Sequence, residues 1–169
     1  VYSGAVASNT TVNRSGFFGV GLGATTYDTT IGYAGELKVW SGGVVHRNEI
    51  NTWGAIILLD GAVANSTTVN ANGGLHIYKG AAAYTTTVTS GAKLGIGLGG
   101  YLHGARLENN AEMTFYDGSK LGGWNDFAGS VKMAGKVNAD GSYISLELQN
   151  RSADQGYLIS NIGYFQNAG

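Results

Sequence analysis

Cysteine and proline are both absent from the 169 residues, and charged residues make up only 12% of them. Without cysteine the chain can form neither disulfides nor thiolate-based sites. The formal net charge of -1 provides no basic surface of the kind that binds nucleic acid or anionic membranes. No apolar run is long enough to cross a bilayer as a helix. These absences exclude several classes of function, but they do not indicate which function the chain has.

Glycine is abundant instead, and many of the 29 glycines recur at an interval of nineteen residues. Seven of them follow this period without a slip, namely Gly4, Gly23, Gly42, Gly61, Gly80, Gly99 and Gly118. Apolar residues keep the same period in three further columns, which begin at Val1, Val12 and Phe18. A constant period of this length indicates a repeat architecture. We expect seven repeats over residues 1–133.

Three segments of each repeat alternate small or apolar residues with polar ones, as β-strands do. They cover the fifth to eighth positions, the tenth to thirteenth, and the seventeenth onward into the next repeat. Glycine at the fourth position, and glycine or asparagine near the fifteenth, predict two sharp corners, because both residues tolerate left-handed backbone. Such a repeat suits one rung of a parallel β-solenoid without helices. Rungs stack about 4.8 Å apart, so seven give a rod about 34 Å long.

One inward column is polar, and its side chains are expected to hydrogen-bond to one another along the stack: Thr10, Thr29, Asn48, Thr67 and Thr86. After about Asp126 the pattern shifts, because Phe127 and Met133 each stand one place late, as a single inserted residue would cause. Farther on, 142–148 and 157–159 resemble strands on either side of a polar turn at 150–155. We expect residues 134–169 to form an irregular capping β segment.

The repeats resemble those of the AIDA-type autotransporter adhesins. The resemblance rests on the period, the phase of the glycines and the Thr-Thr-Val core, as in 3–13 and 60–70, and it covers residues 1 to about 133. It implies a right-handed parallel β-helix exported across a Gram-negative envelope and displayed at the cell surface or outside the cell. It also implies adhesion or self-association, sometimes with sugar attached to Ser or Thr. The family has no catalytic motif to transfer.

Four aromatic residues are the candidate ligand contacts. Tyr2, Trp40, Tyr78 and Tyr116 all occupy the second position of alternate repeats. On a solenoid they would lie on one outer face, ~9.6 Å apart. Flat rings at this interval could stack against sugar rings or another protein. The alternative is that they cover a corner and pack over the glycines of the intervening repeats.

Other polar groups favour structural roles. His46 and His103 are three repeats apart, too far to share a metal, so no metal site and no cofactor are expected. Arg47 and Glu49 are expected to form a surface ion pair, and Asp28 is the only further carboxylate beside them, which argues against general acid–base catalysis. An ice-binding array on Thr11, Thr30, Thr68 and Thr87 is disfavoured by charges in the same column. Glycosylation sequons begin at Asn9, Asn13, Asn65 and Asn150.

Taken together, the sequence predicts a non-enzymatic surface passenger segment that acts as an adhesin or a self-association stalk. Two alternatives stay open: a carbohydrate-binding β-helix module, and, with less support, a polysaccharide-degrading β-helix enzyme. The expected partners are other copies of the chain or host-surface glycan or protein, without nucleic acid or membrane insertion. Because the chain starts at Val1 in the middle of the repeat pattern, we expect a processed piece of a longer chain. Its first rung could associate end to end with another copy.

Overall fold

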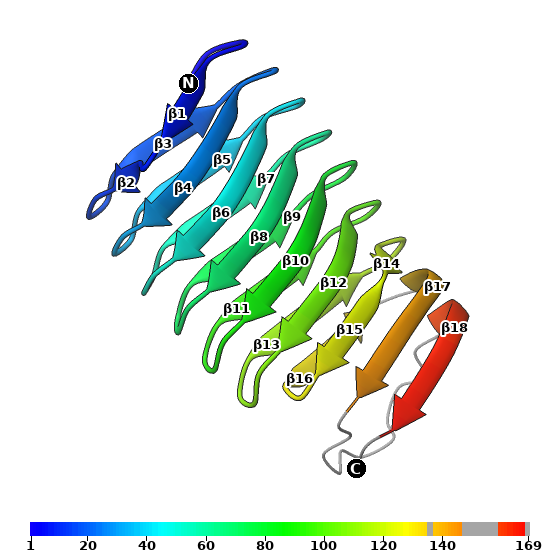
Figure 1. The fold of residues 1–169 in the computed structure, drawn as a ribbon. Helices are drawn as coiled ribbons and strands as arrows, with labels where there is room; N and C mark the ends of the chain where they lie inside the picture. Colours follow the sequence, from blue (N-terminus) through cyan, green and yellow to red (C-terminus); the bar gives the residue numbers. More distant parts are fainter. Residues whose placement is uncertain (135–136, 147–158, 168–169) are drawn as a thin grey trace.

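The computed structural model describes residues 1–134, 137–146 and 159–167, and every regular element in these ranges is a β-strand. The strands wind as a parallel β-solenoid of about seven turns, each about nineteen residues long. Figure 1 shows the turns stacked in chain order, from the blue N-terminal turn to the red strand β18. The predicted architecture is confirmed. In the ranges described, no helix is long and apolar enough to span a membrane.

Each full turn contributes one strand to a larger sheet and one to a smaller sheet. Within the described ranges the larger sheet has eleven strands: β1 Val6–Ser8, β2 Thr11–Val12, β4 Thr25–Ile31, β6 Val44–Ile50, β8 Val63–Val69, β10 Ala82–Val88, β12 Tyr101–Leu107, β14 Lys120–Gly122, β15 Trp124–Phe127, β17 Val137–Leu146 and β18 Ile159–Asn167. The smaller sheet has seven: β3 Phe17–Val20, β5 Glu36–Val39, β7 Ala55–Leu58, β9 Gly74–Ile77, β11 Lys93–Ile96, β13 Glu112–Tyr116 and β16 Ser130–Ala134.

The first corner of each turn is a tight β-turn around the periodic glycine. In the fourth turn the amide of Ala62 donates to the carbonyl oxygen of Leu59 at 2.8 Å, and Gly61 between them has a φ of 73°. A positive φ at this point of a turn is reached freely only by glycine. The glycines also bond along the stack, since the amide of Gly42 donates to the carbonyl of Gly61 at 3.1 Å. The glycine period is therefore a requirement of the backbone.

The second corner has the same turn geometry with more varied residues. The amide of Gly73 donates to the carbonyl oxygen of Asn70 at 2.8 Å, and Asn72 between them has a φ of 60°. The equivalent residues also have positive φ: Ser15, Ala34, Trp53, Gly91 and Asn110. Alanine and tryptophan pay a steric cost in this conformation, which the stacked backbone bonds on either side must offset.

A third bend, which the sequence did not predict, divides the strands of the larger sheet at the ninth position of each turn. The residue there has a φ of between 52° and 67° in the first six turns: Asn9, Asp28, Arg47, Ser66, Thr85 and Gly104. One left-handed residue resets the alternation, so that Ala83 and Thr86 of β10 are both buried. The two short strands expected in each repeat are therefore two arms of one bent strand from β4 to β12, and they are separate strands in the first turn (β1 and β2) and in the seventh (β14 and β15).

The core consists of the predicted apolar columns. On the smaller sheet the side chains of Leu37, Ile56 and Leu75 lie directly above one another and are fully buried. Ile31 and Ile50 face them from the larger sheet and are equally inaccessible. Each such side chain contributes about 1.5–3 kcal/mol by leaving water, mostly through contacts with its own turn and the next. The stack is therefore stabilised by repeated nearest-neighbour packing.

The polar column is buried as expected, but its hydrogen bonding is uneven. The Asn48 side-chain amide donates to the Thr67 hydroxyl of the next turn at 3.3 Å. Thr29 instead bonds Thr26 of its own strand, also at 3.3 Å. The Thr86 hydroxyl has no hydrogen-bond partner. The predicted hydrogen bonding along the polar column is therefore present between Asn48 and Thr67, but it does not run through the whole column. The reason is that a threonine hydroxyl can also turn toward a residue of its own strand, as that of Thr29 does.

The inserted residue lies in the seventh turn, earlier than the sequence pattern suggested. Lys120 of β14 still pairs with Tyr101, nineteen residues away, whereas Asp126 of β15 pairs with Arg106, twenty residues away. The extra residue therefore enters between Gly122 and Asp126 and not after Asp126. It interrupts the strand, which is why the seventh turn has two short strands where the sixth has one.

The next corner is shortened in compensation. Met133 of β16 pairs with Phe115, which is eighteen residues away. Met133 thus stands one place early in the column of Phe115, and the reading that it stood one place late in the column of Met113 is wrong. The offset between paired residues thus rises from nineteen to twenty at the bend and falls to eighteen after the corner. The apolar pattern alone does not distinguish these two changes from a single inserted residue.

The larger sheet continues beyond residue 134. Strand β17 pairs in parallel with β14 and β15, and β18 pairs in parallel with β17, with irregular register between them. Residues 142–146 of the strand expected over 142–148 thus form the second half of β17, and 147 and 148 lie outside the described residues. The expected turn at 150–155 and the start of the strand at 157 lie outside the described residues. The domain boundary at 133/134 stays a prediction.

Candidate functional site

The four candidate aromatic residues all lie at the first corner, on the outside of the stack. Tyr2 is 91% exposed, Trp40 40%, Tyr78 50% and Tyr116 53%. Trp40 and Tyr78 directly follow strands β5 and β9, and Tyr116 ends β13. The turns thus place them in one column, with an intervening turn between each pair. No ring contact joins one of these four residues to another among the described residues.

Trp40 is the most covered member of this column. Its ring meets that of Phe17 edge to face, with centroids 6.1 Å apart. The Trp40 ring also lies over Gly19, where a Cβ atom would be only 2.4 Å from it. Trp40 therefore does pack over a glycine, although that glycine is not Gly21 of its own column. Tyr78 and Tyr116 offer more open ring faces.

Two of the three histidines, His46 and His103, belong to a second outward column, on the larger sheet. His46 stacks on Tyr27 with ring centroids 4.8 Å apart and planes inclined by 10°. His103 packs against Tyr84 and Tyr101 at centroid distances of 5.6 and 5.9 Å. In the parts of the chain that the structure describes, no three His, Cys, Asp or Glu side chains are grouped to hold a metal ion. Both histidines take part in ring packing.

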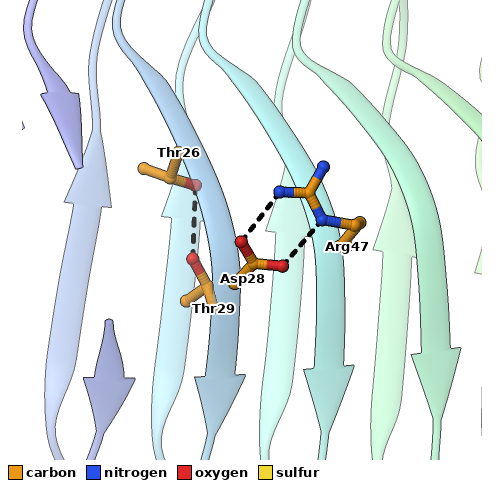
Figure 2. A network of polar contacts seen from close by, with 4 residues as sticks. All are labelled: Thr26, Asp28, Thr29 and Arg47. Atoms are coloured by element: carbon orange, nitrogen blue, oxygen red, sulfur yellow. Dashed lines mark hydrogen bonds and ion pairs between the residues drawn. The ribbon is translucent and has the colours of Figure 1, made fainter. Parts of the chain in front are cut away.

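Arg47 pairs with Asp28 and not with Glu49, contrary to the sequence-based expectation. Its Nε and Nη2 donate to the two Asp28 carboxylate oxygens at 2.7 and 2.8 Å (Figure 2). Both residues lie at the left-handed bend, which turns them toward each other across neighbouring turns. The Arg47 hydrogen bonds lower the pKa of the Asp28 carboxyl from its ordinary value. This two-bond pair joins the second and third turns at the bend.

The strand bend also borders a depression on the molecule's surface. It has a volume of about 500 Å³ and spans three turns, with Thr85, Thr87, Gly104, Arg106, Trp124 and Asp126 among its lining residues. In the first three turns the same bend borders a second, smaller depression of about 360 Å³, with Asp28 and Arg47 among its lining residues. The bend residue of the sixth turn is Gly104, which places no side chain in the depression beside Trp124.

Trp124 borders the depression, and its position depends on the inserted residue. The Asn125 side chain accepts a hydrogen bond from the amide of Ala105 at 2.9 Å. It also donates to the carbonyl oxygens of Gly122 and Gly123 at 3.0 and 2.9 Å. Asn125 thereby closes the irregular loop from inside, and Trp124 is turned outward with 72% of its surface exposed. Bulges commonly redirect a side chain in this way.

Sequence reasoning did not identify this site. The local signal was the pair Gly122–Gly123 directly before an aromatic residue, at the point where the repeat pattern departs from its regular form. In the sequence, Arg106 is one of the charges that interrupt the threonine column. Its approach to Asp126 became visible only when strands β12 and β15 were placed side by side.

Comparisons with known proteins identify a shared fold. No protein-family model matches the chain, and no curated protein matches it in sequence. Among solved structures it is similar to the TibC-catalysed hyper-glycosylated fragment of TibA, with 25% identity and a TM-score of 0.67. The match covers 83% of this chain and 51% of that fragment, so the chain spans about half the fragment's length. It supports, at the level of the fold, the resemblance to AIDA-type autotransporter adhesins that the repeats indicate.

Proposed function

We propose that this chain is part of an adhesin-like passenger displayed at a Gram-negative-type cell surface, and that it acts by contact without catalysis. The observation that carries the proposal is a stack of seven turns that presents the same outward positions again and again. Half-exposed rings recur on one corner of that stack at Trp40, Tyr78 and Tyr116. Weak contacts repeated along one rigid body combine into strong attachment. The fold shared with the TibA fragment supports this assignment.

The proposed partners are other copies of the chain, or a host-surface glycan or protein. Exposed aromatic rings are suited to both, because they offer large contact areas at a low cost in conformational entropy. The small net charge of -1 favours neutral partners over nucleic acid. Insertion of this segment into a membrane is not part of the proposal.

The test is attachment by a surface coated with many copies. Fluorescent beads carrying the 169-residue protein are expected to bind cultured epithelial cells, or one another, more than beads carrying an inert protein do. Replacing both Tyr78 and Tyr116 with alanine should reduce this attachment several-fold. The matched control replaces Thr30 and Thr68 on the other sheet with alanine. Failure of the wild-type beads to bind cells or to aggregate would contradict the proposal.

The second candidate function is carbohydrate binding by the same aromatic column. The specific observation in its favour is that Tyr78 and Tyr116 keep about half of their surface exposed. A glycan array should then show binding that is lost in Tyr78→Ala. Trp40→Ala should also lose binding, but it removes the cover of Gly19 as well, so its thermal stability must be measured alongside. Equal array signals for wild type and both variants would eliminate the column as a glycan site.

A further inference from the structure

We propose that the depression beside Trp124 is a binding site for a neutral pyranose, a sugar residue without a carboxylate or phosphate. The site is lined by Thr85, Thr87, Arg106, Trp124 and Asp126. It is separate from the aromatic column, which lies at the first corner of the turns, whereas this site lies at the bend of the larger sheet.

The size and position of the depression suit a sugar ring. Its volume of about 500 Å³ is within the range of small-molecule sites. The neighbouring turns supply its floor from buried residues, Thr86, Ala105 and Asn125, which the stacked strands hold in place. A floor made of paired strands needs no rearrangement to receive a ligand, which lowers the entropic cost of binding.

One wall is aromatic. Trp124 is 72% exposed because the loop closed by Asn125 turns it outward. Pyranose rings have faces of C–H groups that pack against the flat face of an indole ring, so Trp124 can hold a sugar in one orientation. Tyr84 and His103 directly precede the lining residues Thr85 and Gly104 in strands β10 and β12, and their rings pack together. The surface around the depression is therefore rich in rings.

The remaining walls can exchange hydrogen bonds with hydroxyl groups. Arg106 provides guanidinium donors, Asp126 provides carboxylate acceptors, and Thr85 and Thr87 provide hydroxyls that can do either. Arg106 and Asp126 are register partners on adjacent strands, so both reach the same part of the site. Sugar hydroxyls need donors and acceptors close together, and this arrangement supplies them.

The charges around the site favour a neutral ligand. Arg106 is the only cation among the lining residues, and Asp126 is its register partner on the adjacent strand. Glu108 lies in the adjoining depression, which has a volume of about 350 Å³ and shares both Arg106 and Asp126. One guanidinium next to two carboxylates leaves no excess positive charge for an acidic sugar. We therefore infer a neutral pyranose and not a sialic or uronic acid.

This inference goes beyond the proposed function, since an adhesive stack of turns could act without this site. The test uses agarose beads that carry galactose, glucose, mannose or N-acetylglucosamine, with sialic acid beads as the acidic comparison. The 169-residue protein should be retained on at least one of the neutral beads and not on the acidic ones. Trp124→Ala should weaken retention at least about tenfold, while Trp124→Phe should keep most of it.

Two further variants separate the site from the rest of the molecule. Trp53→Ala removes another exposed indole, 61% accessible and at the second corner, and should leave retention unchanged. Thr87→Trp fills the depression from an outward position while Trp124 stays in place, and should abolish retention. Circular dichroism of every variant checks that the β-structure is intact.

The inference is overturned if the wild-type protein is retained on none of the neutral beads, or equally on the sialic acid beads. It is also overturned if Trp124→Ala and Trp53→Ala weaken retention to the same extent, or if Thr87→Trp has no effect. Cell attachment by beads coated with Trp124→Ala separates the two proposals. Attachment that persists without sugar retention by the wild type would leave the proposed function standing and remove this site alone.

Discussion

Thr67 and Thr86 occupy the same buried column, yet their hydroxyl groups are in different situations. Thr67 accepts a hydrogen bond from Asn48, whereas the Thr86 hydroxyl has no partner. A buried polar group without a partner costs about 1–3 kcal/mol. Thr86→Val, which keeps the branched shape, should therefore raise the free energy of unfolding by about 1 kcal/mol. Thr67→Val should lower it by a similar amount, because the Asn48 amide loses its acceptor.

Urea unfolding of the two variants and the wild type measures both changes. Because the two substitutions are chemically identical and lie one turn apart, the difference between them isolates hydrogen bonding from packing. Destabilisation by Thr86→Val equal to that by Thr67→Val would show that the Thr86 hydroxyl has a partner in solution.

Asp28 is the residue whose titration should be visible in stability. Hydrogen bonds from Arg47 lower the pKa of its carboxyl in the folded protein below the ordinary value of 3.8. A group whose pKa is lower in the folded state stabilises the fold above its unfolded pKa and loses that effect as pH falls through the folded pKa. Asp28→Asn should therefore be less stable than wild type at pH 7, by a small amount because the pair is exposed.

The measurement is thermal unfolding of wild type and Asp28→Asn as a function of pH. The difference between them should persist down to about the ordinary carboxyl pKa of 3.8 and disappear below the lowered value. Added salt should also reduce it at neutral pH, since exposed charges are screened. A difference that is independent of both pH and salt would mean that Asp28 contributes through its backbone conformation and not through its charge.

At the scale of the strand, the seventh turn depends on one side chain. Asn125 forms hydrogen bonds to three backbone groups, those of Ala105, Gly122 and Gly123. Asn125→Ala should destabilise the protein by about 1–3 kcal/mol, because these buried groups lose their partner. Asn109→Ala, at an exposed corner of the preceding turn, is the matched control and should change stability by less than about 0.5 kcal/mol. Chemical denaturation compares the two.

The same substitution should also affect the proposed sugar site, since the Asn125 hydrogen bonds hold the loop that presents Trp124. A tryptophan emission spectrum closer to that of the fully exposed side chain is expected in Asn125→Ala at temperatures where the protein stays folded. Equal stability of the two asparagine variants would show that the loop is held by its backbone alone.

At the scale of the whole molecule, the first turn covers less of its core than the others do. Val1 and Phe18 are only partly buried, whereas their equivalents one turn on, Val20 and Leu37, are fully buried. Strands β1 and β3 are the edges of the two sheets in the described part of the chain. Open sheet edges beside apolar surface favour pairing with another copy. We expect the 169-residue protein to associate end to end as its concentration rises.

Light scattering over a range of concentrations measures this association. Ala7→Lys places a charge on the inward side of edge strand β1, where a second copy would bury it, and should keep the protein monomeric. Ser8→Lys on the outward side of the same strand is the control and should associate like the wild type. A constant monomer mass for the wild type at all concentrations would refute the prediction.

The periodic sequence determined the fold of this protein almost completely. Glycine at every first corner and apolar residues in three columns allow only a stack of equal turns, because both the turn geometry and the burial must repeat together. Those columns were assigned correctly from Val12 to Phe115, and most of their members are fully buried. The position of a residue in the repeat was sufficient to predict its burial, since nearly every stabilising contact is made within one turn or between neighbouring turns.

Tertiary structure alone decided the bend of the larger sheet and the site that it creates. The residues at the bend include Asn9 and Gly104, which tolerate left-handed backbone, but also Arg47 and Thr85, which do not favour it, so no residue type marked the bend in the sequence. The pairing of Arg47 with Asp28, the place of the inserted residue and the opening beside Trp124 all depend on how neighbouring turns are aligned. That alignment is set by the hydrogen bonds between strands, and it cannot be predicted from the order of residues within one turn.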